Sequence, residues 1–159
     1  MSTLRPTGPS RRHRSRGQGL VEFALIAPMF FFLIFVIIEG GRFVFYYHTL
    51  NHAVREGARY AIIHGPNAVD GCPSGPPAVN SEACDVDGDN VRKAIEEAAF
   101  GLAGIGTLTI PNPSYYGPNG NTNARGSNVT VSVSYVYPPI LPLFSNITIS
   151  AESTLVVNN

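Results

Sequence analysis

The chain has 159 residues, of which 44% are hydrophobic and only 14% are charged. This length allows one small domain and a membrane anchor, and the low charged fraction argues against a highly charged soluble protein. The net charge of zero conceals a segregation along the chain. Residues 1–16 hold five arginines and no acid, whereas residues 64–159 hold eight acids and three bases, a net of −5.

The basic cytoplasmic leader comprises residues 1–17, and we expect its polar residues 1–16 to be disordered. A basic arm binds nucleic acid in some proteins. Here it stands directly before an apolar segment, and arginines beside a membrane span remain on the cytoplasmic side. We therefore interpret the leader as a topology signal and expect no nucleic-acid partner.

The apolar segment from Leu20 to Ile38 contains one charge, Glu22. About 20 apolar residues suffice to cross a bilayer as a helix, and such a helix tolerates Pro28 with a kink. A buried helix of a soluble domain would keep one polar face, which this segment lacks. A cleaved secretory signal would have a shorter apolar core and end at small residues. We predict a transmembrane helix at residues 18–41, with the N-terminus cytoplasmic.

Beyond the span, apolar residues recur at spacings of three and four, and no proline occurs between Pro28 and Pro66. This pattern predicts one helix from about Leu20 to Ile63, with an amphipathic extension at residues 42–64. Its predicted apolar face comprises Phe43, Tyr46, Tyr47, Leu50, Val54, Ala58, Ala61 and Ile62.

Residues 65–159 are predicted to form a small extracytoplasmic α+β domain. We expect a loop at residues 65–88, a helix at 90–103 with Asp87 or Asp89 as its N-cap, and a short strand at 107–110. A loop at 111–127 follows, and then two strands at 128–137 and 147–157 that can pair antiparallel. Cys72 and Cys84 lie in the first loop, so they either form a disulfide on an oxidising side or remain free thiols.

The boundary between leader and span carries the most specific motif, residues 17–22 (GQGLVE). A glycine ends a basic leader, and a glutamate follows five residues later inside an apolar helix. This arrangement resembles the processing site of type IV prepilins, which a membrane peptidase cuts after the glycine. The resemblance implies a cut between Gly17 and Gln18, with Glu22 as the fifth mature residue. A carboxylate in lipid is costly without a partner, and the new amino group of Gln18, from the same subunit or a neighbour, can supply one. The alternative is that Glu22 lies at headgroup depth, solvated or paired with Arg16.

The likeness extends further along the helix. Residues 18–25 (QGLVEFAL), 39–42 (EGGR) and 53–61 (AVREGARYA) resemble the TadE-like proteins, pseudopilins of tight-adherence (Flp-type) pilus systems. Glu39-Gly40 replaces the aspartate and aromatic residue that the family has more often. The resemblance implies the membrane, a prepilin peptidase, other pilus subunits and secretion-platform proteins as partners. It also implies assembly contacts, for which the candidate residues are Glu22, Glu39, Arg42, Arg55, Glu56 and Arg59.

Two groups of acidic or histidine residues contain side chains of the kinds that bind metals. His48, His52 and Glu56 are spaced four apart, so that one helix face presents all three. Residues 85–96 place Asp85, Asp87, Asp89 and Glu96 at calcium-loop positions, but Asn90 replaces the required glycine. Solvated helix surface and helix capping explain both sets more simply. We therefore expect no metal, cofactor, small-molecule substrate or catalytic activity.

Together these patterns predict a TadE-like minor pilin or pseudopilin that acts in the assembly of a tight-adherence pilus. A membrane-anchored receptor with an uncleaved leader remains the alternative, as does an enzyme with zinc at the histidine face. The receptor predicts indifference to substitution of Gly17. The enzyme predicts stoichiometric zinc and loss of activity in His48→Ala.

Overall fold

A computed structural model describes residues 16–77, 84–102, 104, 106–118, 120–140 and 145–158; the leader before Arg16 lies outside these ranges. The elements in chain order are α1 (Arg16–Ile63), α2 (Asp89–Ala98), β1 (Thr107–Thr109), β2 (Ser114–Tyr116), β3 (Asn128–Tyr137) and β4 (Ile147–Val156). The predicted α+β class is confirmed: a long N-terminal helix precedes a short helix and antiparallel strands.

The chain divides into two compact units, residues 1–38 and 39–159. Helix α1 contributes to both, so we call residues 16–38 its first part and residues 39–63 its second part. The second part of α1 belongs to the same unit as α2 and the strands. The amphipathic extension is therefore an integral element of the distal domain.

The sheet is built around β3. Strand β4 pairs antiparallel with its whole length, from Asn128 opposite Val156 to Tyr137 opposite Ile147. On the other side of β3, β1 pairs with residues 134–136 and β2 with residues 128–130. Strand β2 lies where we expected only loop, at residues 111–127, and that expectation was wrong at these three residues. So short a strand carries no readable alternation of its own, and its pairing with β3 defines it.

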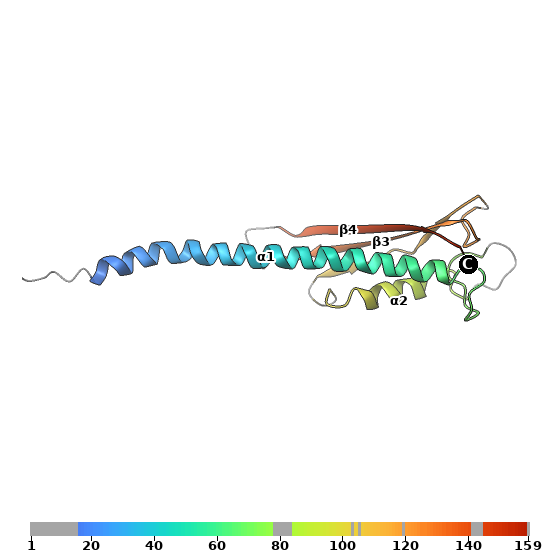
Figure 1. The fold of residues 1–159 in the computed structure, drawn as a ribbon, viewed down its shortest axis with the longest axis horizontal. Coiled ribbons are helices and arrows are strands. Elements are labelled where there is room, and N and C mark those ends of the chain that lie inside the picture. Colours follow the sequence, from blue (N-terminus) through green and yellow to red (C-terminus); the bar gives the residue numbers. More distant parts are fainter. Residues whose placement is uncertain are drawn as a thin grey trace, which may run out of the picture. The chain divides into compact units, whose positions relative to one another are not determined.

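The core lies between one face of β3 and the second part of α1. Every second residue of β3 from Val129 to Tyr137 is buried, as the alternation predicted. Figure 1 shows β3 and β4 running beside this part of α1, with α2 also against it. The buried residues of α1 are Tyr46, Leu50, Ala53, Val54, Gly57, Ala58 and Ala61. Tyr47, placed on the apolar face by sequence, is instead 47% exposed. It lies about 100° around the helix from Tyr46, which takes the inward position.

Gly57 is the point where three elements meet. A Cβ atom at this position would lie 2.3 Å from Cγ1 of Ile95 on α2 and 3.6 Å from Cγ1 of Val131 on β3. Only a residue without a side chain allows α2 to approach α1 this closely. Ala53 and Ala61, one turn before and one turn after, are also small and fully buried.

Helix α2 begins differently from our expectation. Its N-cap residue is Gly88, with φ 73°, and neither Asp87 nor Asp89 caps it. The capping carboxylate is Asp85, which accepts hydrogen bonds from the backbone N–H groups of Asp89 (2.6 Å) and Asn90 (3.1 Å). Because Gly88 takes a left-handed conformation, the chain turns back and Asp85 reaches the free N–H groups.

The C-terminal end of α2 comes earlier than predicted, at Ala98 and not at residue 103. Ala99 N–H still bonds to the carbonyl of Ile95, but Gly101 has φ 91° and breaks the helix. Leu102 nevertheless stays fully buried. The apolar spacing continues past the end of α2, and for this reason the sequence predicted a longer helix.

The loop before α2 is tied at two points. Cys72 and Cys84 form a disulfide. Ser74, fully buried, donates a hydrogen bond from its hydroxyl to Asp85 (2.9 Å), and its backbone N–H bonds to the carbonyl of His64 at the end of α1. Asp85 thus connects the start of α2 to the end of α1.

We predict that Gly57→Ala destabilises the protein by about 1–3 kcal/mol, the usual cost of overpacking a well-filled core. Gly41→Ala is the matched control, since a Cβ at Gly41 in the same helix meets nothing within 4 Å. It should be neutral or slightly stabilising, because alanine favours helix over glycine. Thermal unfolding in detergent, followed by circular dichroism, compares the two. Equal unfolding temperatures would contradict the packing described.

We predict that Asp85→Ala lowers the free energy of unfolding by about 0.5–2 kcal/mol, the range for loss of an N-cap. Asp87→Ala, at an exposed position, should change it by less than about 0.5 kcal/mol. Denaturant unfolding of both variants measures the difference. A larger effect for Asp87 would restore our original assignment of the cap.

Candidate processing and assembly site

The predicted processing residues lie together at the start of α1. Gly17, Gln18 and Glu22 are all exposed, and with Val21 and Leu25 they border a shallow depression on the helix surface. Within the described residues, the Glu22 carboxylate has no hydrogen bond or ion pair. An unpaired carboxylate at the start of an apolar helix is costly if that helix lies in lipid.

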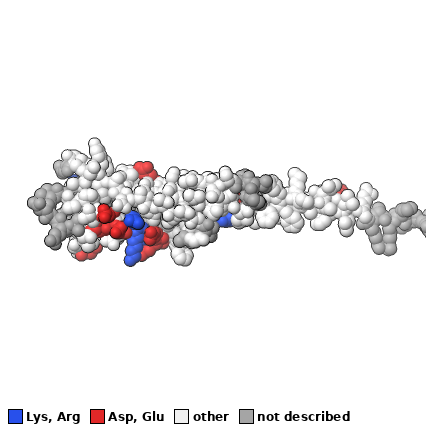
Figure 2. Space-filling model, turned by 180° about the vertical axis from the view of Figure 1, so that it is seen from behind, with Lys and Arg blue, Asp and Glu red and all other residues white. Residues whose placement is uncertain are grey.

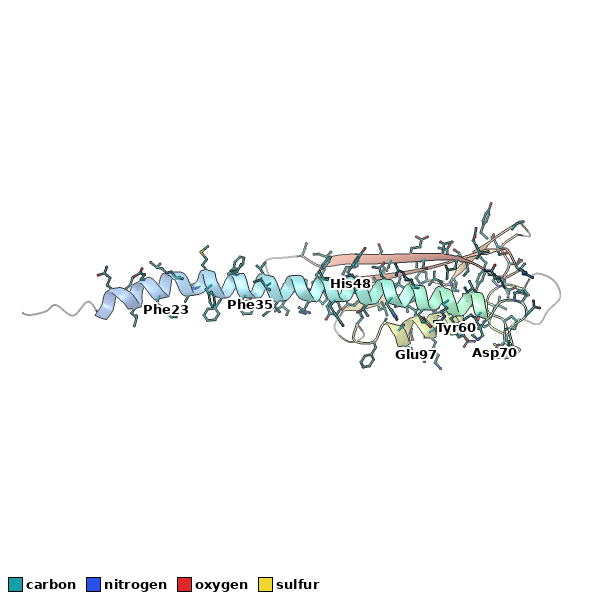
Figure 3. The ribbon with its side chains drawn as sticks, in the orientation of Figure 1. Phe23, Phe35, His48, Tyr60, Asp70 and Glu97 are labelled. Atoms are coloured by element: carbon teal, nitrogen blue, oxygen red, sulfur yellow. A yellow bond between two sulfur atoms is a disulfide. The ribbon has the colours of Figure 1, made fainter. Side chains whose placement is uncertain are left out.

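The first part of α1 exposes apolar side chains on all sides. Leu20, Leu25 and Met29 are more than 70% exposed, and Phe23 is 69% exposed. Phe23 and Phe35 stand out from the helix in Figure 3, and Figure 2 shows almost no charge over this stretch. Among the described residues, α1 is the one helix that is both long enough and apolar enough to cross a membrane. It fits a single-pass membrane anchor.

Glu39 lies at the start of the second unit and has three partners. Its carboxylate accepts the phenolic hydrogen of Tyr137 and the backbone N–H of Ile140, at 3.3 Å and 3.4 Å to its two oxygens. Arg42, one turn further along α1, is 3.3 Å away and forms an ion pair with it. The Glu39 side chain is only 12% exposed, so these contacts replace most of its water.

The ring of Tyr137 is packed in the same cluster. The Arg42 guanidinium lies 5.4 Å from its centroid and 5.7 Å from that of Tyr46, both within cation–π range. Phe43 meets Tyr137 edge-on at 6.0 Å. Burial and the hydrogen bond to Glu39 raise the pKa of Tyr137 to about 12, so its hydroxyl stays protonated and keeps donating at neutral pH.

The remaining candidate assembly residues lie on the surface of α1. Arg55 is exposed, and Glu56 and Arg59 form a pair at 3.9 Å with side chains 47% and 67% exposed. Such a pair contributes about 0–1 kcal/mol to stability. Arg55, Glu56 and Arg59 are therefore more available for contacts with partners than for holding the fold.

The two candidate metal clusters do not come together. Within the described residues, no group of three His, Cys, Asp or Glu side chains is placed to hold a metal ion. His48 and His52 border one hollow on α1, while Glu56 borders another, beside Lys93 and Glu97 of α2. In the second cluster, Asp85 is occupied by its bonds to Ser74 and the start of α2.

Two structural features of this segment were not predicted from sequence. The Glu39–Tyr137 contact joins residues 98 positions apart, and only the spacing of Glu39 and Arg42 hinted at a paired carboxylate. Gly57, inside the TadE-like stretch, was not singled out. Its position between the buried alanines Ala53 and Ala61 was the available signal.

We predict that Tyr137→Phe destabilises the protein by about 1.5–3 kcal/mol, the range for a hydrogen bond to a charged group. Tyr116→Phe is the control, because Tyr116 is 74% exposed on β2. Thermal unfolding in detergent should separate Tyr137→Phe from wild type and leave Tyr116→Phe unchanged. An unaltered midpoint for Tyr137→Phe would show that Glu39 does not depend on this hydroxyl.

Comparison with known proteins bears on the same helix. The family model "TadE-like protein" matches residues 17–59, which include Gly17, Glu22, Glu39, Arg42 and Gly57. No curated protein and no solved structure matches the chain. The matched residues extend from the start of the apolar anchor into the part of α1 that packs on the sheet. Through this segment the chain is similar to the TadE-like protein family.

Proposed function

We propose that the chain is a minor pilin or pseudopilin of a tight-adherence (Flp-type) pilus, matured by a prepilin peptidase and active in pilus assembly. The observation that carries the proposal is the TadE-like match over residues 17–59. It coincides with a glycine and a glutamate, five residues apart, at the exposed start of an apolar helix.

The chemistry of maturation follows from the spacing of these residues. Hydrolysis of the bond between Gly17 and Gln18 removes the arginine-rich leader and leaves a free amino group on Gln18. Glu22 is four residues further on, one helical turn away, so the new cation and the carboxylate can meet. The pair forms within one subunit or between neighbours, and in either case it lowers the cost of a carboxylate in lipid.

The orientation we propose puts the N-terminus in the cytoplasm and residues 65–159 outside it. Five arginines precede the span, and positive residues near a span stay cytoplasmic. The Cys72–Cys84 disulfide supports this orientation, because disulfides persist in extracytoplasmic compartments. The membrane in question is then the inner one.

The protein's work, in this proposal, is association without catalysis. The apolar span contacts the spans of other subunits, and Glu22 contributes to that contact. Arg55, Glu56 and Arg59 offer exposed charges to pilus subunits or secretion-platform proteins. The chemical step belongs to the prepilin peptidase and not to this chain.

The N-terminal residue of the protein extracted from membranes of its native host tests the proposal. A chain that starts at Gln18 supports maturation by a prepilin peptidase. A chain that starts at Met1 or Ser2 favours the alternative, a membrane-anchored receptor with an uncleaved anchor.

We predict that Gly17→Leu abolishes processing, because a peptidase that cuts after glycine has no room for a large side chain there. Gly19→Leu is the matched control: both glycines lie in α1, and a Cβ at either meets nothing within 4 Å. Neither variant should disturb folding. Intact mass of each variant, expressed with the peptidase, should show the leader retained in Gly17→Leu and lost in Gly19→Leu. Normal loss of the leader in Gly17→Leu contradicts the proposed site.

A further inference from the structure

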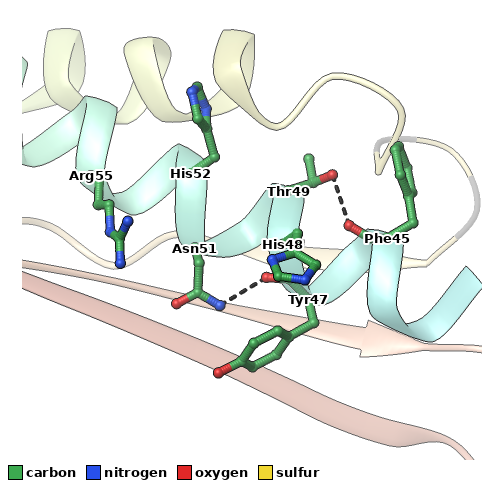
Figure 4. Close-up of a pocket in the computed structure, with 7 residues that line it drawn as sticks. All are labelled: Phe45, Tyr47, His48, Thr49, Asn51, His52 and Arg55. Carbon is green, nitrogen blue, oxygen red and sulfur yellow. Dashed lines mark hydrogen bonds between the residues drawn. The ribbon is translucent and has the colours of Figure 1, made fainter.

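One exposed face of α1 changes in character along the second part of the helix. Val44 and Phe45, 51% and 57% exposed, come first, and Tyr47 and His48 follow. Further along come Asn51 and His52, and Arg55 comes last. Figure 4 shows this face, with Phe45 at one end and Arg55 at the other. The order is thus apolar, then amphipathic, then polar and finally cationic.

The polar groups nearest the apolar end are already partly satisfied by the helix itself. The Thr49 hydroxyl donates to the carbonyl of Phe45 (2.9 Å), and the Asn51 amide donates to the carbonyl of Tyr47 (2.8 Å). Moving this face out of bulk water therefore costs less than its residue types suggest.

A second element adds apolar surface at the same end of the unit. Ile140 is 58% exposed, and its backbone N–H bonds to Glu39. Ile147, 43% exposed, begins β4 opposite Tyr137, which also bonds to Glu39. Both isoleucines are thus held near the start of the second part of α1. We call Val44, Phe45, Tyr47, Ile140 and Ile147 the apolar collar.

The collar contains no free charge. Glu39 and Arg42 form an ion pair, and the sequence has no Asp, Glu, Lys or Arg between Phe43 and Val54 or between Tyr137 and Ala151. An exposed apolar patch without a charged rim on this side is unusual for a surface in water. Aromatic residues with a polar tip are instead enriched where a membrane meets water.

The position of the collar along the helix matches that boundary. The hydrocarbon core of a bilayer, about 30 Å thick, takes about 20 helical residues, which, counted from Leu20 at the start of the apolar segment, end at Glu39. The headgroup layer beyond it is about 5–7 Å thick, or about three to five residues of helix. Val44 falls within those residues, Phe45 and Tyr47 follow within three residues, and the backbone N–H of Ile140 bonds to Glu39 where the layer begins.

We propose that the apolar collar lies in the outer headgroup layer of the bilayer, so that the distal domain rests on the lipid surface and is not held away from it. This inference depends on the membrane anchor in the proposed function. The graded change from Phe45 to Arg55 follows the change from hydrocarbon to water. A docking site for a protein partner would instead have an apolar centre surrounded by a polar rim.

The chain contains no tryptophan, so a single introduced tryptophan reports on one position. Phe45→Trp and Ile140→Trp place the reporter in the collar. Phe32→Trp places it in the span, and Tyr116→Trp places it on exposed β2, paired with β3 about nine residues, or roughly 30 Å, from Tyr137. Each full-length variant is reconstituted in phosphatidylcholine vesicles with or without brominated acyl chains, with iodide as the aqueous quencher.

The inference predicts that brominated lipid quenches most of the emission of Phe45→Trp, Ile140→Trp and Phe32→Trp, while iodide quenches only Tyr116→Trp strongly. If brominated lipid quenches Phe32→Trp but only iodide quenches the collar variants, the collar lies in water. The inference then fails, while the proposed function is unaffected. Blue-shifted collar emission that neither agent quenches means that protein covers the collar, which also overturns it. If Phe32→Trp itself escapes lipid quenching, the anchor fails and the proposed function fails with it.

Discussion

A helix that is apolar on every side cannot remain in water, and this constraint governs the first part of α1. From Phe23 to Ile38 the sequence has no charged residue, and most of the large apolar side chains there are about half exposed or more. Left in water, this surface would drive aggregation. A bilayer satisfies it, because a helix bonds most of its backbone groups internally and tolerates the lack of an N–H donor at Pro28. That anchor underlies the roles we assign to the arginine-rich leader, to the Glu22 carboxylate and to the domain after Ile38.

The second part of α1 obeys a different constraint, since one of its faces packs against protein. Small residues at Ala53, Gly57 and Ala61 allow α2 and β3 to come close, and Glu39 ties the start of this part to the end of β3 through Tyr137. The TadE-like stretch at residues 53–61 therefore has a packing role of its own. Its exposed charges, Glu56 and Arg59, pair with each other at the surface and are accessible to partners.

Much of the fold could be read from sequence because its signals are local. The alternation of β3 predicted both ends of that strand, and the period of α1 predicted its end at Ile63, although the helix begins at Arg16, four residues before the expected Leu20. Strand β2 and the true cap of α2 could not be found in this way. Strand β2 exists only because β3 offers it a partner, and Asp85 reaches the helix only because Gly88 is left-handed.

The residues of the candidate site also divide into those with a local sequence signal and those without one. Gly17, Gln18 and Glu22 were singled out because a glycine after a basic leader and a glutamate five residues later resemble the prepilin processing site, and their role stays a prediction. The sequence did not reveal that Tyr137 is the partner of Glu39. Tyr137 lies in β3, whose alternation already explained it as a core residue. Contacts between residues distant in sequence leave no mark on local periodicity.

Extraction of the full-length protein from membranes tests the anchor most directly. Washing at high salt and then with alkaline carbonate strips proteins that are only adsorbed, while an inserted helix stays in the lipid. The apolar first part of α1 predicts that the chain remains in the membrane pellet through both washes and is released only by detergent. Release into the carbonate supernatant as a soluble monomer would contradict the anchor and the assignments that depend on it.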